Sequence, residues 1–145
     1  MELVIKNFEE LTNGELYEIL KARAEIFVVE QNCIYNDLDG VDKESLHVFI
    51  NCEDELAAYL RVIPKGVCCD TVKIGRVITV RRGEGFGVKV MAAGLEAAKK
   101  RLSADIVTIS AQTHAIGFYE KCGFEVVSDV YMEEGIPHVK MVCKL

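Results

Sequence analysis

The feature that most constrains this chain is a glycine-rich turn between a β-rich run and a helical run. Residues 73–80 read Lys-Ile-Gly-Arg-Val-Ile-Thr-Val, residues 81–87 read Arg-Arg-Gly-Glu-Gly-Phe-Gly, and apolar residues at helical spacing follow. Backbone N–H groups at the start of a helix bind anions, because they point at the ligand from the positive end of the helix dipole. The turn therefore predicts a phosphate site, or else glycines that only let helix and strand pack closely.

Two common phosphate-binding patterns do not fit this turn. The Walker pattern and G-x-G-x-x-G both need a glycine at position 88, where the sequence has valine. A dinucleotide-binding fold would also place the turn after the first strand, whereas about eighty residues precede it here. A phosphate site at this turn would therefore be of another kind.

Length and charge exclude several classes of protein. The chain has 145 residues, 50% hydrophobic and 28% charged, which is the balance of one globular domain spanning residues 1–145. Its net charge of −6 offers no basic surface to nucleic acid. No leader or membrane-spanning run is evident, and the six cysteines lack metal-site spacing. We therefore expect a cytoplasmic protein without nucleic-acid, membrane or metal partners.

The apolar periodicity alternates between strands and helices along the chain. Runs rich in β-forming residues predict strands at 3–6, 45–51, 55–62, 70–80, 105–111, 124–131 and 138–144. Helical spacing predicts helices from Thr12, capped through Glu15, to about Glu30, from Gly85 to about 101, and over 113–121. The segment 133–137 is too long for a tight hairpin turn. This order predicts an α+β fold with one central βαβ crossover.

Two motifs at the predicted turn and short helix resemble a known family. Arg82-Gly-Glu-Gly-Phe-Gly87 matches the R-x-x-G-x-G/A signature of the GNAT acetyltransferases, and Phe118-Tyr-Glu-Lys-Cys-Gly-Phe124 is similar to their Tyr-Glu-Lys-x-Gly-Phe stretch. Blocks at 23–33 and 37–40, with Tyr131 and 135–138, resemble the ElaA-like branch of that family. The resemblance implies a mixed, mostly antiparallel twisted sheet with helices on both faces.

The resemblance also implies acetyl-CoA as the acetyl donor. In this family the turn binds the pyrophosphate through its amides, and pantetheine pairs along the preceding strand, near where two parallel strands diverge. Lys89, one turn into the helix, could reach a phosphate or simply be solvated. Gln112 stands where many relatives carry asparagine. The cofactor-binding residues expected on this basis are Ile78, Thr79, Val80, Arg82, Gly83, Gly85, Phe86, Gly87, Val88 and Gln112.

Chemistry requires an acid for the departing thiolate and a base for the acceptor amine. A tyrosine at the place of Tyr119 protonates the thiolate in relatives, so we expect Tyr119 to be the general acid. Deprotonating an amine with an ordinary lysine pKa costs roughly 4–5 kcal/mol at pH 7. Glu30 is the expected base, unless it forms an ion pair with Arg23. The further candidates are Asp39, His47, which could instead be a buried structural histidine, His114 and His138.

An acidic segment follows the first predicted helix. Acidic residues at 30, 37, 39, 42 and 44 do not fit a calcium loop, because a glycine at position 40 would put Tyr35 and Leu46 at ligand positions. The segment could attract a cationic amine, or could be a solvated loop. Pairing with Arg61 and Arg76 would weaken the argument for an amine.

The sequence therefore predicts an N-acetyltransferase that moves the acetyl group of acetyl-CoA directly to an amine. The alternative is a non-catalytic module on the same fold that binds CoA or acetyl-CoA as a sensor or interaction partner. The acceptor, a small-molecule or peptide amine, stays open. The oligomeric state also stays open, although a homodimer is common in the family.

Overall fold

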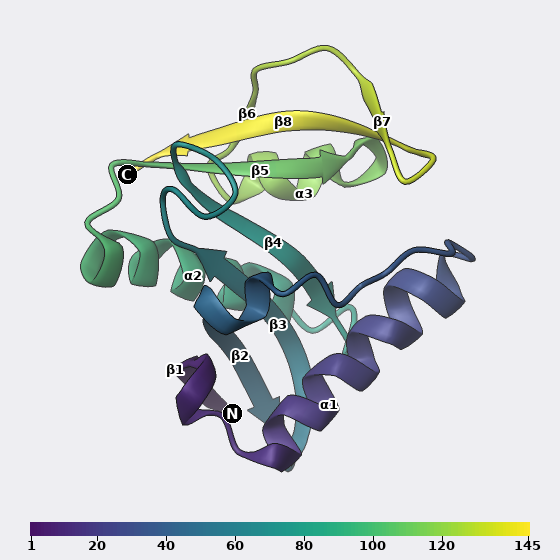
Figure 1. Cartoon of the computed structure of the whole chain (residues 1–145), viewed down its shortest axis with the longest axis vertical. Coiled ribbons are helices and arrows are strands. Elements are labelled where there is room, and N and C mark those ends of the chain that lie inside the picture. The colour runs from purple at the N-terminus through teal and green to yellow at the C-terminus, as the bar shows by residue number, and fades with distance from the viewer.

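A twisted sheet of eight strands forms the centre of the molecule in the computed structural model, which describes residues 1–145 (Figure 1). The strands are β1 (Glu2–Asn7), β2 (Leu46–Cys52), β3 (Glu55–Ile63), β4 (Val72–Thr79), β5 (Ile106–Gln112), β6 (Glu125–Val126), β7 (Tyr131–Glu133) and β8 (Ile136–Lys144). Their order is β1-β2-β3-β4-β5-β8-β6, and β7 pairs with β8. Only β4 and β5 are parallel. The predicted mixed, mostly antiparallel sheet is confirmed.

Helices cover both faces of this sheet, as expected. They are α1 (Asn13–Arg23), α2 (Phe86–Leu102) and α3 (Ile116–Lys121), with the short segments η1 (Phe8–Glu10), η2 (Ala24–Glu30), η3 (Val41–Glu44) and η4 (Thr113–Ala115). On one face, Ile19 of α1 packs with Phe49 and Tyr59. On the other face, Val90 and Met91 of α2 belong to the main core with residues of every long interior strand. The α2 helix makes the crossover between β4 and β5.

The first helix begins at the predicted cap, and helical winding continues beyond α1 through η2 to Glu30, near the expected end. The Thr12 hydroxyl accepts a hydrogen bond from the Glu15 N–H at 3.1 Å, and the Glu15 carboxylate accepts one from the Thr12 N–H at 2.9 Å. From Ala24 to Glu30 the helix has π-type hydrogen bonding. Sequence periodicity did not predict this wider winding. Ile26, Phe27 and Glu30 of this segment line the cleft described below, and such local changes of helix geometry are common at functional sites.

A bulge in β4 opens the centre of the sheet. Arg61 of β3 lies opposite Gly75, but Tyr59 lies opposite Ile78, so β4 has one more residue than β3 over this stretch. Arg76 takes up the difference with a φ of 50°. Beyond Lys73, β4 no longer pairs with β5. The two parallel strands therefore diverge, and the β5-facing edge of β4 is free.

The end of the chain differs from the predicted pattern. The strand expected over 124–131 is confined to Glu125–Val126, and a separate strand, β7, follows at Tyr131–Glu133. The expected long connection is wrong: β7 and β8 form a tight hairpin through Glu134 and Gly135. Both turn residues have positive φ, 51° and 73°, as a two-residue type I′ hairpin requires.

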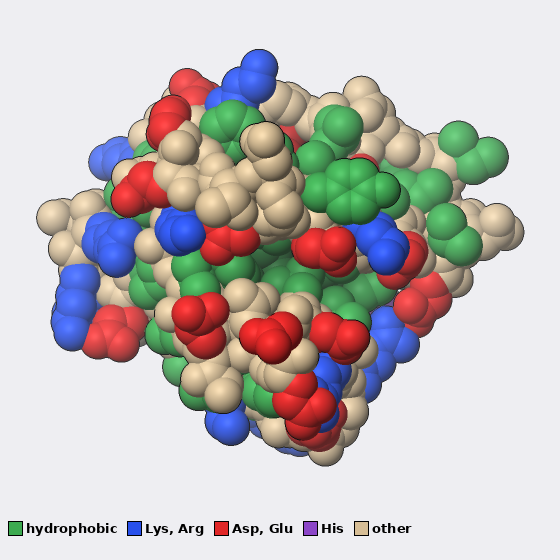
Figure 2. All heavy atoms as spheres, turned by 90° about the horizontal axis from the view of Figure 1, so that it is seen from below, with side chains coloured by type: hydrophobic (Ala, Val, Ile, Leu, Met, Phe, Trp, Pro, Cys, Tyr) green, Lys and Arg blue, Asp and Glu red, His purple; other side chains and the backbone are tan.

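The surface carries both signs of charge. Figure 2 shows acidic and basic side chains distributed over one face, with hydrophobic side chains in a hollow between them. None of the helices has the length and apolar character needed to cross a bilayer.

Candidate active site

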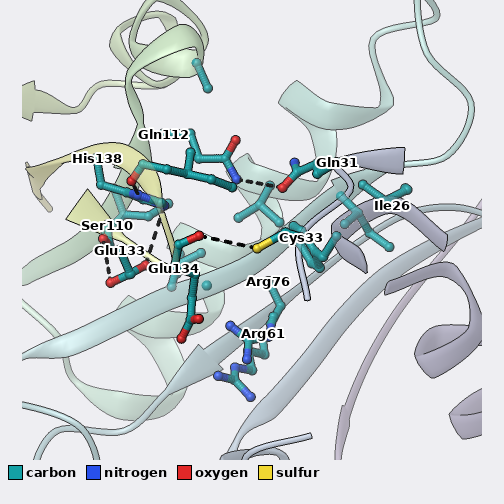
Figure 3. Close-up of a pocket in the computed structure, with 18 of the residues that line it drawn as sticks. Ile26, Gln31, Cys33, Arg61, Arg76, Ser110, Gln112, Glu133, Glu134 and His138 are labelled. Atoms are coloured by element: carbon teal, nitrogen blue, oxygen red, sulfur yellow. Dashed lines mark hydrogen bonds and ion pairs between the residues drawn. The ribbon is translucent and has the colours of Figure 1, made fainter. Parts of the chain in front are cut away.

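A cleft of about 920 Å³ lies where β4 and β5 diverge (Figure 3). One side consists of β4 and the end of the first helix, including Glu30 and Gln31. The other side consists of β5, the start of α3 and the β7–β8 hairpin. The cleft therefore brings together segments that are far apart in the sequence, and it opens toward the glycine-rich turn at Arg82.

The glycine-rich turn presents a row of free backbone donors. No N–H group from Arg82 to Val88 donates a hydrogen bond to another group of the chain. Gly83 and Gly85 both have a φ of 81°, a conformation that other residues rarely adopt, and a Cβ on either would contact nothing within 4 Å. The turn therefore combines unpaired donors with open space at the N-terminus of a 17-residue helix, which is the arrangement that binds phosphate.

Gly87 has a packing role instead. A Cβ at this position would lie 2.8 Å from the Thr79 hydroxyl and 3.3 Å from the Phe118 ring. This glycine lets the start of α2 approach β4 and α3. Of the three glycines in the turn, Gly87 is therefore the one explained by close packing. Phe86, the first residue of α2, is buried in the core.

The strand before the turn is held on only one side near the cleft. Ile78 is buried opposite Tyr59, and Thr79 pairs with Ala58. The Val80 N–H donates to the Ala57 carbonyl at 2.8 Å. Ile78 and Thr79 line the cleft, so their β5-facing edge can accept another extended chain.

Arg82 and Glu30 form an exposed ion pair at the mouth of the cleft. Arg82 Nη1 lies 2.7 Å from Glu30 Oε1, and Arg82 Nε donates to the Thr79 carbonyl at 3.3 Å. Hydrogen bonding from Arg82 lowers the pKa of Glu30. The alternative pairing of Glu30 with Arg23 is wrong, since Arg23 binds Asp37 and Asp42 on the far side of the helix.

Tyr119 lines the cleft from the second half of α3. The side chain is largely buried, and its hydroxyl has no hydrogen-bond partner within the chain. Burial raises the pKa of Tyr119, so the hydroxyl is protonated at neutral pH. Gln112 lies nearby at the end of β5. Its amide donates to Gln31 Oε1 at 3.1 Å across the cleft, and its oxygen accepts from His114 at 2.7 Å.

The β7–β8 hairpin contributes His138, one of the candidate bases, and Glu133, which the sequence did not single out. His138 lines the cleft, and its Nδ1 lies 2.7 Å from the Ile136 carbonyl. Because a carbonyl only accepts, Nδ1 carries the proton and Nε2 is left as the acceptor nitrogen. Nε2 lies 3.5 Å from the Glu133 carboxylate, which also accepts a hydrogen bond from Ser110 at 3.3 Å.

The hairpin register explains why Glu133 was missed and why the contacts of Tyr131 were not foreseen. Tyr131 lies opposite His138, stacks on its ring and hydrogen-bonds to Ser110. Recognising Glu134-Gly135 as a two-residue hairpin turn would have predicted that Tyr131 and Glu133 lie close to His138. The expectation of a longer connection instead left this proximity unpredicted. His47, another candidate base, lies outside the cleft. It is buried between the Tyr59 hydroxyl and the Asp42 carbonyl, each at 2.8 Å, and has the structural role considered for it.

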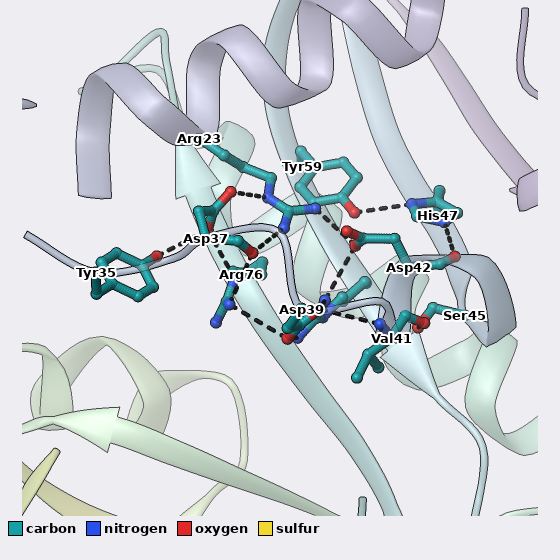
Figure 4. Close-up of polar contacts among 11 residues, drawn as sticks. Arg23, Tyr35, Asp37, Asp39, Val41, Asp42, Ser45, His47, Tyr59 and Arg76 are labelled. Carbon is teal, nitrogen blue, oxygen red and sulfur yellow. Dashed lines mark hydrogen bonds and ion pairs between the residues drawn. The ribbon is translucent and has the colours of Figure 1, made fainter. Parts of the chain in front are cut away.

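Three arginines neutralise the acidic segment (Figure 4). The ion pairs join Arg23 to Asp37 and Asp42, Arg61 to Asp39 and Asp42, and Arg76 to Asp37 and Asp39. Burial alone would raise the pKa of Asp39, but the Arg61 guanidinium outweighs it and holds the pKa well below its usual value. Asp39 is therefore a poor base. The segment does not provide the free negative potential that would attract an amine.

Comparisons with known proteins are consistent in pointing to one family. Residues 15–145 match the family model described as acetyltransferase (GNAT) domain. Protein ElaA of Escherichia coli strain K12 is 40% identical over 136 residues, which cover 91% of this chain and 89% of that protein. A UPF0039 protein of Schizosaccharomyces pombe is also 40% identical, over 100% of this chain and 98% of its own.

Solved structures agree with the sequence matches. The crystal structure of Escherichia coli ElaA has a TM-score of 0.91 at 37% identity, with 99% of both chains covered. An acyl-CoA N-acyltransferase from Pseudomonas aeruginosa has a TM-score of 0.90 at 36% identity, also with 99% of both chains covered. A Bacillus subtilis acetyltransferase solved in complex with CoA shares the fold at 22% identity, with a TM-score of 0.64 and 99% of both chains covered.

Proposed function

This chain belongs to the ElaA-like branch of the GNAT acetyltransferase family, and from that premise we propose that it transfers the acetyl group of acetyl-CoA to an amine. The observation that carries the proposal is the row of unpaired N–H groups from Arg82 to Val88, in a turn whose residue Arg82 lines the cleft. A pyrophosphate fits this turn because neutral amides and a helix dipole can hold it even in a protein of net charge −6.

The free edge of β4 supports a site for the rest of the cofactor. An extended pantetheine arm could pair with the backbone at Ile78 and Thr79, where β5 has diverged. Such pairing would bring the thioester toward Tyr119 and Gln112, which line the same cleft. Bound acetyl-CoA supplies an activated acetyl group. The chain's own residues would orient it and move protons.

Tyr119 is the proposed general acid. Its protonated hydroxyl can pass a proton to the sulfur that leaves as the bond between carbon and sulfur breaks. The Gln112 amide, hydrogen-bonded to Gln31 and His114, is the proposed further contact with the cofactor in the same cleft.

His138 is the proposed acceptor of the amine proton, assisted by Glu133. The Nε2 atom is the free acceptor nitrogen, and the adjacent carboxylate stabilises the imidazolium that forms when it takes a proton. Glu30, expected from the sequence as the base, is instead engaged by Arg82, which makes its carboxylate less basic. We therefore assign Glu30 to positioning Arg82 at the turn.

Isothermal titration calorimetry with acetyl-CoA tests the proposal. We expect binding by the wild-type chain and a loss of at least tenfold in affinity for Gly85→Val, because valine cannot readily adopt a φ of 81°. Gly66→Val is the matched control, since Gly66 has a φ of 92°, has equally open surroundings and lies outside the cleft. Failure of the wild-type chain to bind would refute the proposal. Binding without turnover of any amine would favour the non-catalytic module.

A further inference from the structure

The end of the cleft away from the glycine-rich turn has a floor formed by one face of β3, β4 and β5. Gly75 lies opposite Arg61 of β3, and Lys73 lies between Ile63 of β3 and Thr108 of β5. A Cβ at Gly75 would contact nothing within 4 Å. The floor is therefore open above Gly75, with room for a ligand group beside Lys73.

Two cationic side chains at this floor keep donors that no carboxylate occupies. Lys73 lines the cleft and forms no ion pair. Arg76 contacts Asp37 through Nε at 2.8 Å and Asp39 through Nη2 at 3.3 Å, which leaves Nη1 unengaged. The bulge in β4 places the Arg76 side chain on this side of the sheet (Figure 3).

The carboxylate of Asp39, beside these cations, already accepts hydrogen bonds at both oxygens. Asp39 Oδ1 accepts from the Val41 N–H at 3.0 Å and from Arg61 at 2.9 Å. Asp39 Oδ2 accepts from Arg61 at 2.7 Å and from Arg76 at 3.3 Å. Arg61 lines the cleft but is almost fully buried. This end of the cleft therefore offers hydrogen-bond donors with positive charge to a ligand.

The β7–β8 hairpin gives its side of the cleft negative charge, in contrast to the positive charge at the floor. The Glu133 side chain is half exposed, Glu134 also lines the cleft, and neither is paired with a lysine or an arginine. Glu133 lies next to His138, the proposed acceptor of the amine proton. The cleft is therefore polarised, with uncommitted cations on β4 and uncommitted carboxylates on the hairpin.

We propose that the acceptor is an amine that also carries a carboxylate, that is, an amino acid. The carboxylate would bind Lys73 and Arg76, and the amine would lie at Glu133 and His138 before attack. This inference rests on the proposed function and names the substrate class of the same site. A diamine or a polyamine would leave Lys73 facing a like charge.

Matched acceptor pairs test the inference through thiol release from acetyl-CoA. The pairs are glycine with glycinamide, β-alanine with β-alaninamide and 4-aminobutyrate with its amide, with 1,4-diaminobutane as a dication. Rates are compared per neutral amine across a pH series, because an amide lowers the amine pKa. We expect at least one acid to exceed its amide by tenfold or more in kcat/KM. Equal or faster turnover of the amides or the diamine would overturn the inference while leaving the proposed function intact.

The variant Lys73→Met tests whether Lys73 causes the preference for the acid over its amide. We expect the variant to raise KM for the preferred acid about tenfold, to change kcat little, and to remove the preference over the amide. Lys100→Met is the control, because Lys100 is exposed on α2, pairs only with Glu96 and lies outside the cleft. A preference that survives in Lys73→Met would contradict the assignment.

A second measurement covers the case in which no acceptor is acetylated. Saturation-transfer difference NMR then detects binding of the same acids and amides to the wild-type chain in the presence of CoA. Signals from an acid but not from its amide, lost in Lys73→Met and kept in Lys100→Met, would support the carboxylate site even though the transfer reaction had failed. No difference between acid and amide would overturn it.

Discussion

Tyr119 combines an apolar surrounding with a free hydroxyl. Its ring lies edge-on to Phe118 and Phe124, with ring centroids 5.2 and 5.9 Å away. These rings exclude water, and burial raises the pKa of Tyr119. Such a tyrosine keeps its proton over a wide pH range, and the proposed transfer needs a group that holds a proton until sulfur leaves.

Tyr119→Phe is expected to lower kcat by about a hundredfold, within the range usual for loss of a general acid. The variant removes only the hydroxyl, so the affinity for acetyl-CoA and the melting temperature should stay close to those of the wild-type chain. Thiol release with an identified acceptor measures kcat, and calorimetry measures the affinity. An unchanged kcat would mean that another group, or water, protonates the thiolate.

His138→Gln is expected to lower kcat by a similar factor, because Gln cannot take up the proton of the acceptor amine. The control is His114→Gln, since His114 also lines the cleft but bonds to Gln112. A loss of kcat in His114→Gln with kcat kept in His138→Gln would transfer the role to His114.

At the scale of elements, the approach of α2 to β3 depends on one glycine within the helix. A Cβ at Gly94 would lie 2.9 and 3.1 Å from the two terminal methyl groups of Leu60. Leu60 is fully buried and therefore has little space to move. The small residue sets how closely the crossover helix packs on the sheet, and so where its N-terminal turn lies.

Gly94→Ala should lower the free energy of unfolding by about 1–3 kcal/mol, the usual cost of overpacking, although alanine favours helix by about 1 kcal/mol. Gly117→Ala is the matched control in α3, because a Cβ there meets nothing within 4 Å; it should be neutral or stabilising. Urea unfolding measures both. Stabilisation by Gly94→Ala would mean that Leu60 adapts at no cost.

Local signals allowed most elements to be predicted from the sequence. The box formed by Thr12 and Glu15 and the glycine turn at 83–87 depend on neighbouring residues, and both local structures were found as predicted. Partners distant in sequence could not be predicted from such signals. Glu30 and Arg82 are 52 residues apart, so helical spacing suggested Arg23 instead. The π-type winding before Glu30 likewise leaves no trace in apolar periodicity.

At the scale of the whole molecule, buried charges link the first helix, the following loop and the sheet. Arg23 is fully buried, and Arg61 and Asp42 are nearly so. Burial alone would raise the pKa of Asp42, but its pairing with Arg23 outweighs burial, so the pKa is lowered. Burial lowers the pKa of the neighbouring His47. Both shifts mean that the unfolded chain takes up protons before the folded chain does as pH falls.

The free energy of unfolding should therefore decrease toward acid in two stages. His47, with an ordinary pKa of about 6.5 when unfolded, contributes to the loss below about pH 7, and Asp39 and Asp42 contribute below about pH 5. Urea unfolding from pH 8 to pH 4 measures this dependence. His47→Gln should flatten the slope between pH 7 and pH 5 relative to wild type. A slope equal to that of wild type would contradict the assignment.

The position of β8 has a consequence for synthesis on the ribosome. This strand pairs with β5, β6 and β7, yet it follows all of them in the sequence and so emerges after them. The nascent chain can form the β1–β4 meander and α2 early, but β5 gains its antiparallel neighbour only when β8 arrives. His138 arrives with that strand, so a partly synthesised chain would already have the glycine-rich turn while lacking the proposed base.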